Sequence, residues 1–248
     1  MMALVLAGIA LAAATLSGLT GLGGGTLLIA ALYALGFMPA VAVPLHAAVQ
    51  LVSNAARVVA YLPHVRWSGF GLFLVGALPA PFALAPLVVT VPADAVRVAM
   101  AVFLLLALLP GWLKWLRLAG APGLVVAGAL SGGLGTVVGA TGLIIAPFFL
   151  DRGWPKETVI ATMAVCQAAG HAAKILAFAV AGFGLGGQLD LLWPMALAVV
   201  AGTALGRWLI GLVDESRFRW LVKVILLVLA CQLGIDGAIG LVQQGGTQ

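Results

Sequence analysis

The fold of this chain is indicated by two stretches of its sequence: QLVSNAARVVAY at residues 50–61 and QAAGHAAKILAF at residues 167–178. They align without gaps. The matching residues are Gln50, Asn54, Arg57 and Tyr61 in the first stretch and Gln167, His171, Lys174 and Phe178 in the second. Polar residues are rare inside apolar sequence, and finding them twice in the same order and spacing indicates an internal duplication.

The segments upstream of these stretches extend the duplication. The matching pairs are Leu-Ser-Gly at residues 16–18 and 130–132, a stretch rich in glycine and threonine at residues 21–26 and 135–142, and a proline at Pro39 and Pro155. An apolar run lies before the proline in both copies. We therefore predict two repeat units, residues 1–119 and residues 120–248.

The composition places both repeats in a lipid bilayer. The chain is 64% hydrophobic and 8% charged, with a mean hydropathy of +1.22, which a water-soluble core of this size would not tolerate. Apolar runs of about 20 residues recur, and they lack the period-2 alternation of a membrane β-barrel. Backbone groups in lipid must be hydrogen-bonded within their own element, so the sequence predicts an all-α polytopic membrane protein.

Each repeat divides into four apolar segments. They cover residues 3–36, 40–62, 69–91 and 95–116 in the first repeat, and residues 122–150, 156–182, 191–213 and 218–242 in the second. As one helix the first segment would be roughly 50 Å long, too long for one crossing and too short for two. Four glycines between Gly21 and Gly25 interrupt it, which favours a helical hairpin with two short limbs. Pro79, Pro81 and Pro86 predict a bend in the third segment.

The basic residues support these hairpins. If each repeat begins with a hairpin, Arg97 falls on one face of the membrane and the other loop charges fall on the opposite face. Those charges are Arg66, Lys114, Arg117, Arg152, Lys156, Arg217 and Arg219. The positive-inside rule then places both termini outside (periplasmic) at a bacterial inner (plasma) membrane. Each repeat crosses an odd number of times, so we predict two inverted repeats, each a glycine-broken helical hairpin followed by three transmembrane helices.

The polar stripes are the first candidate for a binding site. Residues spaced i, i+4 and i+7 share one face of a helix, and an ionisable group inside a membrane span is costly unless it faces protein or water. Arg57 and Lys174 are therefore predicted to flank a central site. Both also lie near enough to a helix end to snorkel to the interface. For His171, the alternatives are a packed bundle histidine and a ligand or proton relay.

The glycine breaks are the second candidate. A helix that starts at such a break directs free N–H groups and a positive dipole end toward the bundle centre, where they suit an anion. The same glycines also suit close helix packing. The combined prediction is a substrate-binding site made of Gln50, Asn54, Arg57, Gln167, His171, Lys174, Gly24, Gly25, Thr26, Thr141 and Gly142.

The sequence gives little support for nucleic-acid binding, catalysis, or metal or cofactor binding. The net charge of +5 comes from basic residues scattered at segment ends, not from a basic face that would bind nucleic acid. We predict no catalytic residues, metal site or cofactor, because no nucleophile is paired with a base and His46 and His64 lack metal spacing. Cys166 and Cys231 are interpreted as buried apolar residues. An intramembrane enzyme and a structural scaffold are the weaker alternatives.

Over nearly its whole length, the chain resembles the TauE/SafE family of sulfite exporters, also called the TSUP family. The resemblance is carried by SGLTGLGGGTLLIAALYALGF at residues 17–37, by SGGLGTVVGATGLIIAPFFLDRGWPKETVIAT at residues 131–162, and by the two polar stretches that follow them. It implies transport of sulfite or of an organosulfonate such as sulfoacetate. The second glycine break departs from the first, since it reads Gly-Ala-Thr-Gly at residues 139–142.

The expected partners are a small anionic substrate and the lipid bilayer. An interior-negative membrane potential favours export of an anion by alternating access without ATP, with proton coupling through His171 as an option. A carboxylate or another small anion is the alternative cargo. The sequence leaves the oligomeric state open, with a homodimer as one arrangement.

Overall fold

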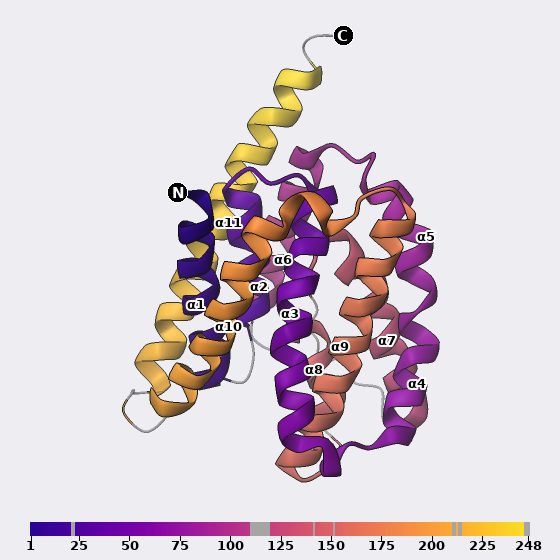
Figure 1. The fold of residues 1–248 in the computed structure, drawn as a ribbon. Coiled ribbons are helices and arrows are strands. Elements are labelled where there is room, and N and C mark those ends of the chain that lie inside the picture. The colour runs from indigo at the N-terminus through magenta and orange to yellow at the C-terminus, as the bar shows by residue number, and fades with distance from the viewer. Residues whose placement is uncertain are drawn as a thin grey trace.

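The computed structural model describes residues 1–20, 23–109, 120–140, 142–150, 152–209, 212 and 215–245, and these are mostly helical. The first predicted repeat contains α1 (Met2–Thr20), α2 (Gly24–Ala34), α3 (Pro39–Tyr61), the 3-10 turn η1 (Leu62–His64), α4 (Trp67–Ala77), α5 (Pro79–Val88) and α6 (Ala93–Leu108). The second contains α7 (Gly120–Val137), α8 (Gly142–Leu150), α9 (Lys156–Val180), the 3-10 turn η3 (Leu185–Gln188), α10 (Leu189–Leu209) and α11 (Glu215–Gly245). The described ranges contain no strand, and their helices form a bundle beyond which α11 projects (Figure 1).

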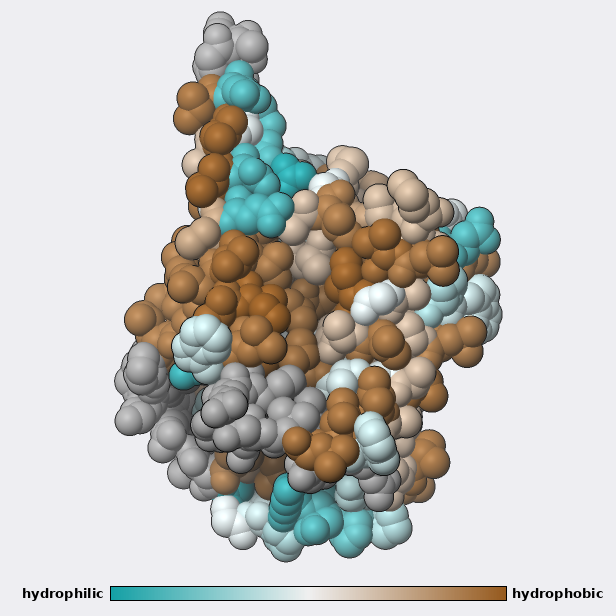
Figure 2. Space-filling model, turned by 90° about the vertical axis from the view of Figure 1, so that its left-hand side faces the viewer, coloured by the Kyte–Doolittle hydropathy of each residue, from teal (hydrophilic) through white to brown (hydrophobic). Residues whose placement is uncertain are grey.

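Several of these helices suit a bilayer. Within the described ranges, five stretches are long and apolar enough to cross one: Trp67–Val88, Gly120–Val137, Lys156–Val180, Leu185–Gly206 and Trp220–Gln244. Hydrophobic residues dominate the face shown in Figure 2, and hydrophilic ones gather at its lower end and along the upper part of α11. The chain is therefore an all-α polytopic membrane protein, which confirms that part of the sequence prediction.

The first apolar segment of each repeat folds as two helices of unequal length. α1 has 19 residues and α2 has 11, or about 28 Å and about 16 Å. Gly24 packs against Ala13 and Ser17 of α1, so α2 starts beside the last turns of α1 instead of continuing it. Neither Met2–Ser17 nor Gly24–Ala34 is among the described stretches that are long and apolar enough to cross a bilayer, which agrees with the expectation of two short limbs. α2 is short because Gly36, with a φ of +86°, follows its end. α7 and α8 repeat the inequality, with 18 and 9 residues.

The third segment of the first repeat is broken where prolines were expected to bend it. α4 ends at Ala77 and α5 begins at Pro79, with Leu78 between them. Proline has no N–H to continue the hydrogen bonding of a helix, but it fits the first position of a new one. The break therefore follows from Pro79.

The two predicted repeats are interleaved. α1 packs against α10, α4 and α5 against α7, α6 against α11, and α3 against α9. Thus the opening helix of each repeat contacts the third segment of the other repeat. The larger hydrophobic core draws buried side chains from both, including Leu6, Phe103, Phe178 and Leu233. The boundaries of the repeats, residues 1–119 and 120–248, stay a prediction.

α3 and α9 run in opposite directions. The turn after α3 meets the turn before α9, because the guanidinium of Arg66 lies 5.2 Å from the centre of the Trp154 ring. Arg152 lies over the same ring at 5.4 Å. The backbone N–H of Arg66 also donates a 3.0 Å hydrogen bond to Oγ1 of Thr162 in α9. Figure 1 shows the α3–α4 turn at the lower end of the bundle.

Arg97 lies at the other end. It pairs with Asp94 in the first turn of α6, and Asp94 also accepts a 2.9 Å hydrogen bond from Nε2 of Gln244 near the end of α11, which is uppermost in Figure 1. The hairpin topology predicts this separation of Arg97 from Arg66 and Arg152. Which end faces the cytoplasm stays a prediction, and Lys114 and Arg117 lie outside the described residues.

Replacing Thr162 by valine tests the junction of these turns. Thr162 is fully buried, and the change removes the acceptor of the Arg66 N–H while keeping the side-chain shape. We expect the free energy of unfolding to fall by about 1 kcal/mol, seen as a lower thermal midpoint in detergent. Thr158→Val, one turn earlier in α9, is the matched control and should melt like the wild type. Equal midpoints for both variants would contradict the role of this hydrogen bond.

The two cysteines have different surroundings. Cys166 is buried in a second hydrophobic cluster with Phe73 and Phe149, as expected. Cys231 is exposed on α11, so the expectation that it is buried was wrong. α11 packs on α6 and α2, and Cys231 lies on an exposed part of the helix.

Candidate functional site

The first glycine break positions the start of α2. Gly23 has a φ of +91°, in the left-handed region that glycine adopts without strain. α2 begins at the next residue, and the N–H groups of its first turn have no partner within the helix. Gly25 and Thr26 of that turn line a cavity.

The second break lies next to the first. Gly139 has a φ of +84°, and α8 begins at Gly142. A Cβ atom on Gly139 would lie 2.5 Å from Cγ1 of Ile29 in α2, so the second break packs against α2, and Gly142 lines the same cavity as Gly23 and Gly25. Thr141, a predicted site residue, lies outside the described residues.

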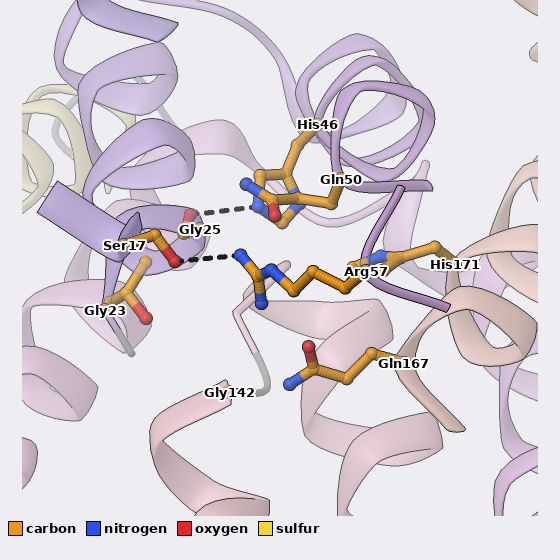
Figure 3. Close-up of a pocket in the computed structure, with 10 residues that line it drawn as sticks. Ser17, Gly23, Gly25, His46, Gln50, Arg57, Gly142, Gln167 and His171 are labelled. Carbon is orange, nitrogen blue, oxygen red and sulfur yellow. Dashed lines mark hydrogen bonds between the residues drawn. The ribbon is translucent and has the colours of Figure 1, made fainter. Parts of the chain in front are cut away.

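The cavity has a volume of about 30 Å³ and lies between the two breaks and helices α3 and α9 (Figure 3). This volume is on the order of two water molecules. Its lining consists of Ser17, Gly23, Gly25, Thr26, His46, Gln50, Arg57, Gly142, Gln167 and His171. Every described lining residue is polar or glycine, although 64% of the chain is hydrophobic. The cavity therefore suits a small hydrophilic ligand.

Arg57 reaches this cavity from near the end of α3. Side chains on a helix point back toward its N-terminus, which directs Arg57 from the end of α3 to the bundle centre. Its Nη2 donates a 3.0 Å hydrogen bond to Oγ of Ser17 and a 3.4 Å hydrogen bond to Oγ of Ser53. Figure 3 shows the guanidinium group turned toward Ser17. Arg57 therefore faces the protein interior instead of snorkelling to the interface.

Each glycine break has a glutamine amide beside it. A Cβ atom on Gly25 would lie 3.2 Å from the amide carbon and nitrogen of Gln50, and one on Gly142 would lie 3.5 Å from Nε2 of Gln167. The two glycines are separated in sequence by the same distance as the two glutamines. Glycine at both positions leaves room for an amide that donates hydrogen bonds into the cavity.

Three predicted site residues do not line the cavity. The amide nitrogen of Asn54 donates a 2.9 Å hydrogen bond to the carbonyl of Gln50 in its own helix. Lys174 is 1% exposed, and its Nζ lies 3.5 Å from the carbonyl oxygen of Gly135 in α7. Lys174 thus points to the neighbouring helix and not to lipid. Gly24 packs against α1.

Three residues that line the cavity were not predicted from the sequence: Ser17, Gly23 and His46. His46 is 1% exposed, and it lies one turn before Gln50 on the face of the polar stripe, so extending the stripe by four residues would have included it. Gly23 belongs to the glycine run but was not selected. Ser17 is far from Arg57 in sequence, and its hydrogen bond to Arg57 depends on the hairpin.

The charge of the site is positive. Within the described part of the chain, the only salt bridge joins Arg97 and Asp94, which lie at one end of the bundle. Arg57 and Lys174 have no carboxylate partner there, and no group of three metal-ligating side chains occurs. A buried cation without a counter-charge is costly, so the site favours an anionic ligand.

A family model for the sulfite exporter TauE/SafE matches residues 6–233. The chain belongs to the TauE/SafE family. No curated protein and no solved structure matches it. TauE/SafE proteins are transporters of sulfite and related sulfur anions, not enzymes, so the prediction of a transporter is confirmed. In a TauE/SafE protein, a positive, polar cavity within the bundle is where such an anion is expected.

Proposed function

We propose that this TauE/SafE protein exports a small inorganic sulfur oxyanion, with sulfite as the first choice, across the bacterial inner membrane by alternating access. The observation that carries the proposal is the lining of the central cavity. Its described lining offers amide, hydroxyl, imidazole and guanidinium groups, and none of the described lining residues has an apolar side chain. These groups suit the oxygens of a compact anion better than the carbon chain of an organosulfonate, because polar groups buried against carbon lose their hydrogen bonds.

Alternating access is supported by the small size of the cavity and by the arrangement of the helices around it. A cavity that holds about two waters must widen before an anion can enter it and leave it. α3 and α9 run in opposite directions and each supplies part of the lining, as inverted repeats would. Rocking of one repeat against the other would open the cavity to one side at a time.

The proposed direction follows from electrostatics. An interior-negative membrane potential is worth about 2.3 kcal/mol per charge for each 100 mV, and it drives anions outward. We propose that both termini lie on the periplasmic side, since the end of the bundle with Arg66 and Arg152 is the more basic one and would face the cytoplasm.

Competition for sulfite efflux tests this function. Proteoliposomes loaded with radiolabelled sulfite are given a potassium gradient and valinomycin to set the potential. Efflux should accelerate when the interior is negative. Internal unlabelled sulfite should compete fully, whereas benzenesulfonate should compete at least about tenfold more weakly, because its ring would displace hydrogen bonds in the polar lining.

Protein-free liposomes measure leakage in this assay, and sulfoacetate and acetate extend the series. We expect sulfoacetate to compete less well than sulfite and acetate to compete poorly. If acetate competes as well as sulfite, the protein is a carboxylate carrier and the proposed cargo is wrong. Efflux equal to that of protein-free liposomes would reject transport of sulfite altogether.

A further inference from the structure

Two histidines face each other at the cavity. His46 comes from α3 and His171 from α9, and their ring centres are 5.6 Å apart with an interplanar angle of 74°. Both line the cavity, and they are 1% and 4% exposed. Figure 3 places both residues beside Arg57. The pair has no counterpart in the duplication, since the residue that matches His46 in the second repeat is Met163.

The hydrogen bonds of the two rings are incomplete. Nε2 of His46 lies 2.9 Å from the carbonyl oxygen of Gly25. A carbonyl only accepts, so Nε2 carries the hydrogen, and Nδ1 of the neutral ring is a bare acceptor. Among the described residues, Nδ1 of His46 has no hydrogen-bond partner, and neither has Nδ1 of His171. Buried polar atoms are normally satisfied, so these two nitrogens point to a ligand that they receive during function.

The surroundings of the pair supply positive charge and no described carboxylate. Arg57 lines the same cavity, and Lys174 lies one turn after His171. The hairpin helices α1, α2, α7 and α8 contain no charged residue. The other charged or titratable residues on the elements that pack against the pair are Tyr33 on α2, Tyr61 on α3, His64 on η1, Lys156, Glu157 and Cys166 on α9, and Asp190 and Arg207 on α10. Lys156, Glu157 and Asp190 lie in the first turns of their helices, away from the central cavity.

We propose that His46 and His171 form a proton-binding site in the anion cavity and that the proton and the anion bind cooperatively. A proton on either ring adds a positive charge that no described carboxylate offsets, whereas a bound anion offsets it. Linkage makes this effect reciprocal: the anion raises the proton affinity of the pair by the factor by which the proton raises the anion affinity. The identity of the anion rests on the proposed function. With a divalent anion such as sulfite, one bound proton leaves a net negative charge, so the membrane potential still favours exit.

Nitrogen NMR of the imidazole rings tests the proposal without altering the pair. The chain has three histidines, and the third, His64, is exposed at the end of the bundle. The full chain, labelled with nitrogen-15 in histidine and held in detergent micelles near neutral pH, is titrated with sodium sulfite. His64→Gln identifies the signals of the exposed ring. We expect sulfite to shift the nitrogen signals of one buried ring to the protonated form and to leave those of His64 unchanged.

Binding heats give a second measurement with variants. Titration of sulfite in bis-tris and in Tris, whose ionisation enthalpies differ, yields the number of protons taken up per anion bound. Wild type and His64→Gln should take up the same number, and His46→Gln and His171→Gln should take up fewer, by up to about one proton. Comparison with His64→Gln cancels the protons that sulfite itself binds.

The outcomes separate this proposal from the proposed function. If sulfite binds while both buried rings stay neutral, or if all variants take up equal numbers of protons, the proton site is refuted and sulfite transport stands. If sulfite does not bind the wild type, the proposed function fails, and the cooperative site that rests on it fails too.

Discussion

Arg57→Ala is expected to lower sulfite efflux from proteoliposomes by about tenfold to a hundredfold while the protein stays folded. Arg57 is the only cationic side chain among the described residues that line the cavity, apart from the histidines. A hydrogen bond to a charged group contributes about 1.5–3 kcal/mol, which corresponds to that range of affinity. Arg57→Lys should retain part of the activity, because lysine keeps the charge but loses the planar fork of donors.

Arg66→Ala is the matched control for this loss. Arg66 carries the same charge, but it lies in the turn after α3 and over Trp154, outside the cavity. We expect sulfite efflux by the Arg66→Ala variant to equal that of the wild type. An Arg57→Ala protein that exports sulfite at the wild-type rate would remove the guanidinium from the mechanism and leave the glycine breaks as the main anion-binding groups.

Gly24→Ala is expected to prevent the first hairpin from closing. A Cβ atom at this position would lie 2.1 Å from the carbonyl oxygen of Ala13 and 2.7 Å from Cβ of Ser17. The first of these is a backbone atom of α1, which no rotamer change can move away. Overpacking in a core typically costs about 1–3 kcal/mol, and a clash with backbone places Gly24→Ala at or above about 3 kcal/mol. The variant should accumulate poorly, melt well below the wild type in detergent, and transport nothing.

Gly8→Ala provides the comparison within α1. A Cβ atom on Gly8 meets nothing within 4 Å, and alanine favours a helix over glycine by about 1 kcal/mol. This variant should therefore melt at or above the wild-type temperature and keep its transport. If Gly24→Ala has the same melting temperature as Gly8→Ala, the close contact between α1 and α2 is not needed for stability. The position of Ser17 beside Arg57 then does not depend on that contact.

The two predicted repeats contribute differently to the cavity despite their matching sequences. Arg57 and Lys174 are equivalent in the duplication, yet Arg57 lines the cavity and Lys174 approaches the carbonyl of Gly135 in α7. Both side chains reach the first limb of the hairpin of their own repeat, since Arg57 bonds to Ser17 in α1. The positive charge of the binding surface is therefore asymmetric, and a bound anion would lie nearer to the first repeat.

Much of this protein could be predicted from its sequence, for a physical reason. In a chain this apolar, lipid requires helices, prolines and glycines mark where helices break, and each polar residue within a span needs a partner in the protein or in water. The helical bundle, the glycine breaks and the polar faces of α3 and α9 follow from these requirements, as do Gln50, Arg57, Gln167 and His171 as residues of a central site.

Only the tertiary structure decided which polar residues share the cavity. Spacing along a helix determines the face on which a residue lies but not the neighbour that it meets, so Ser17 beside Arg57 and His46 beside His171 depend on how distant helices pack. Lys174 lies on the predicted face of α9, but its Nζ approaches the carbonyl oxygen of Gly135 in α7. The spacing of residues along the sequence does not reveal this acceptor.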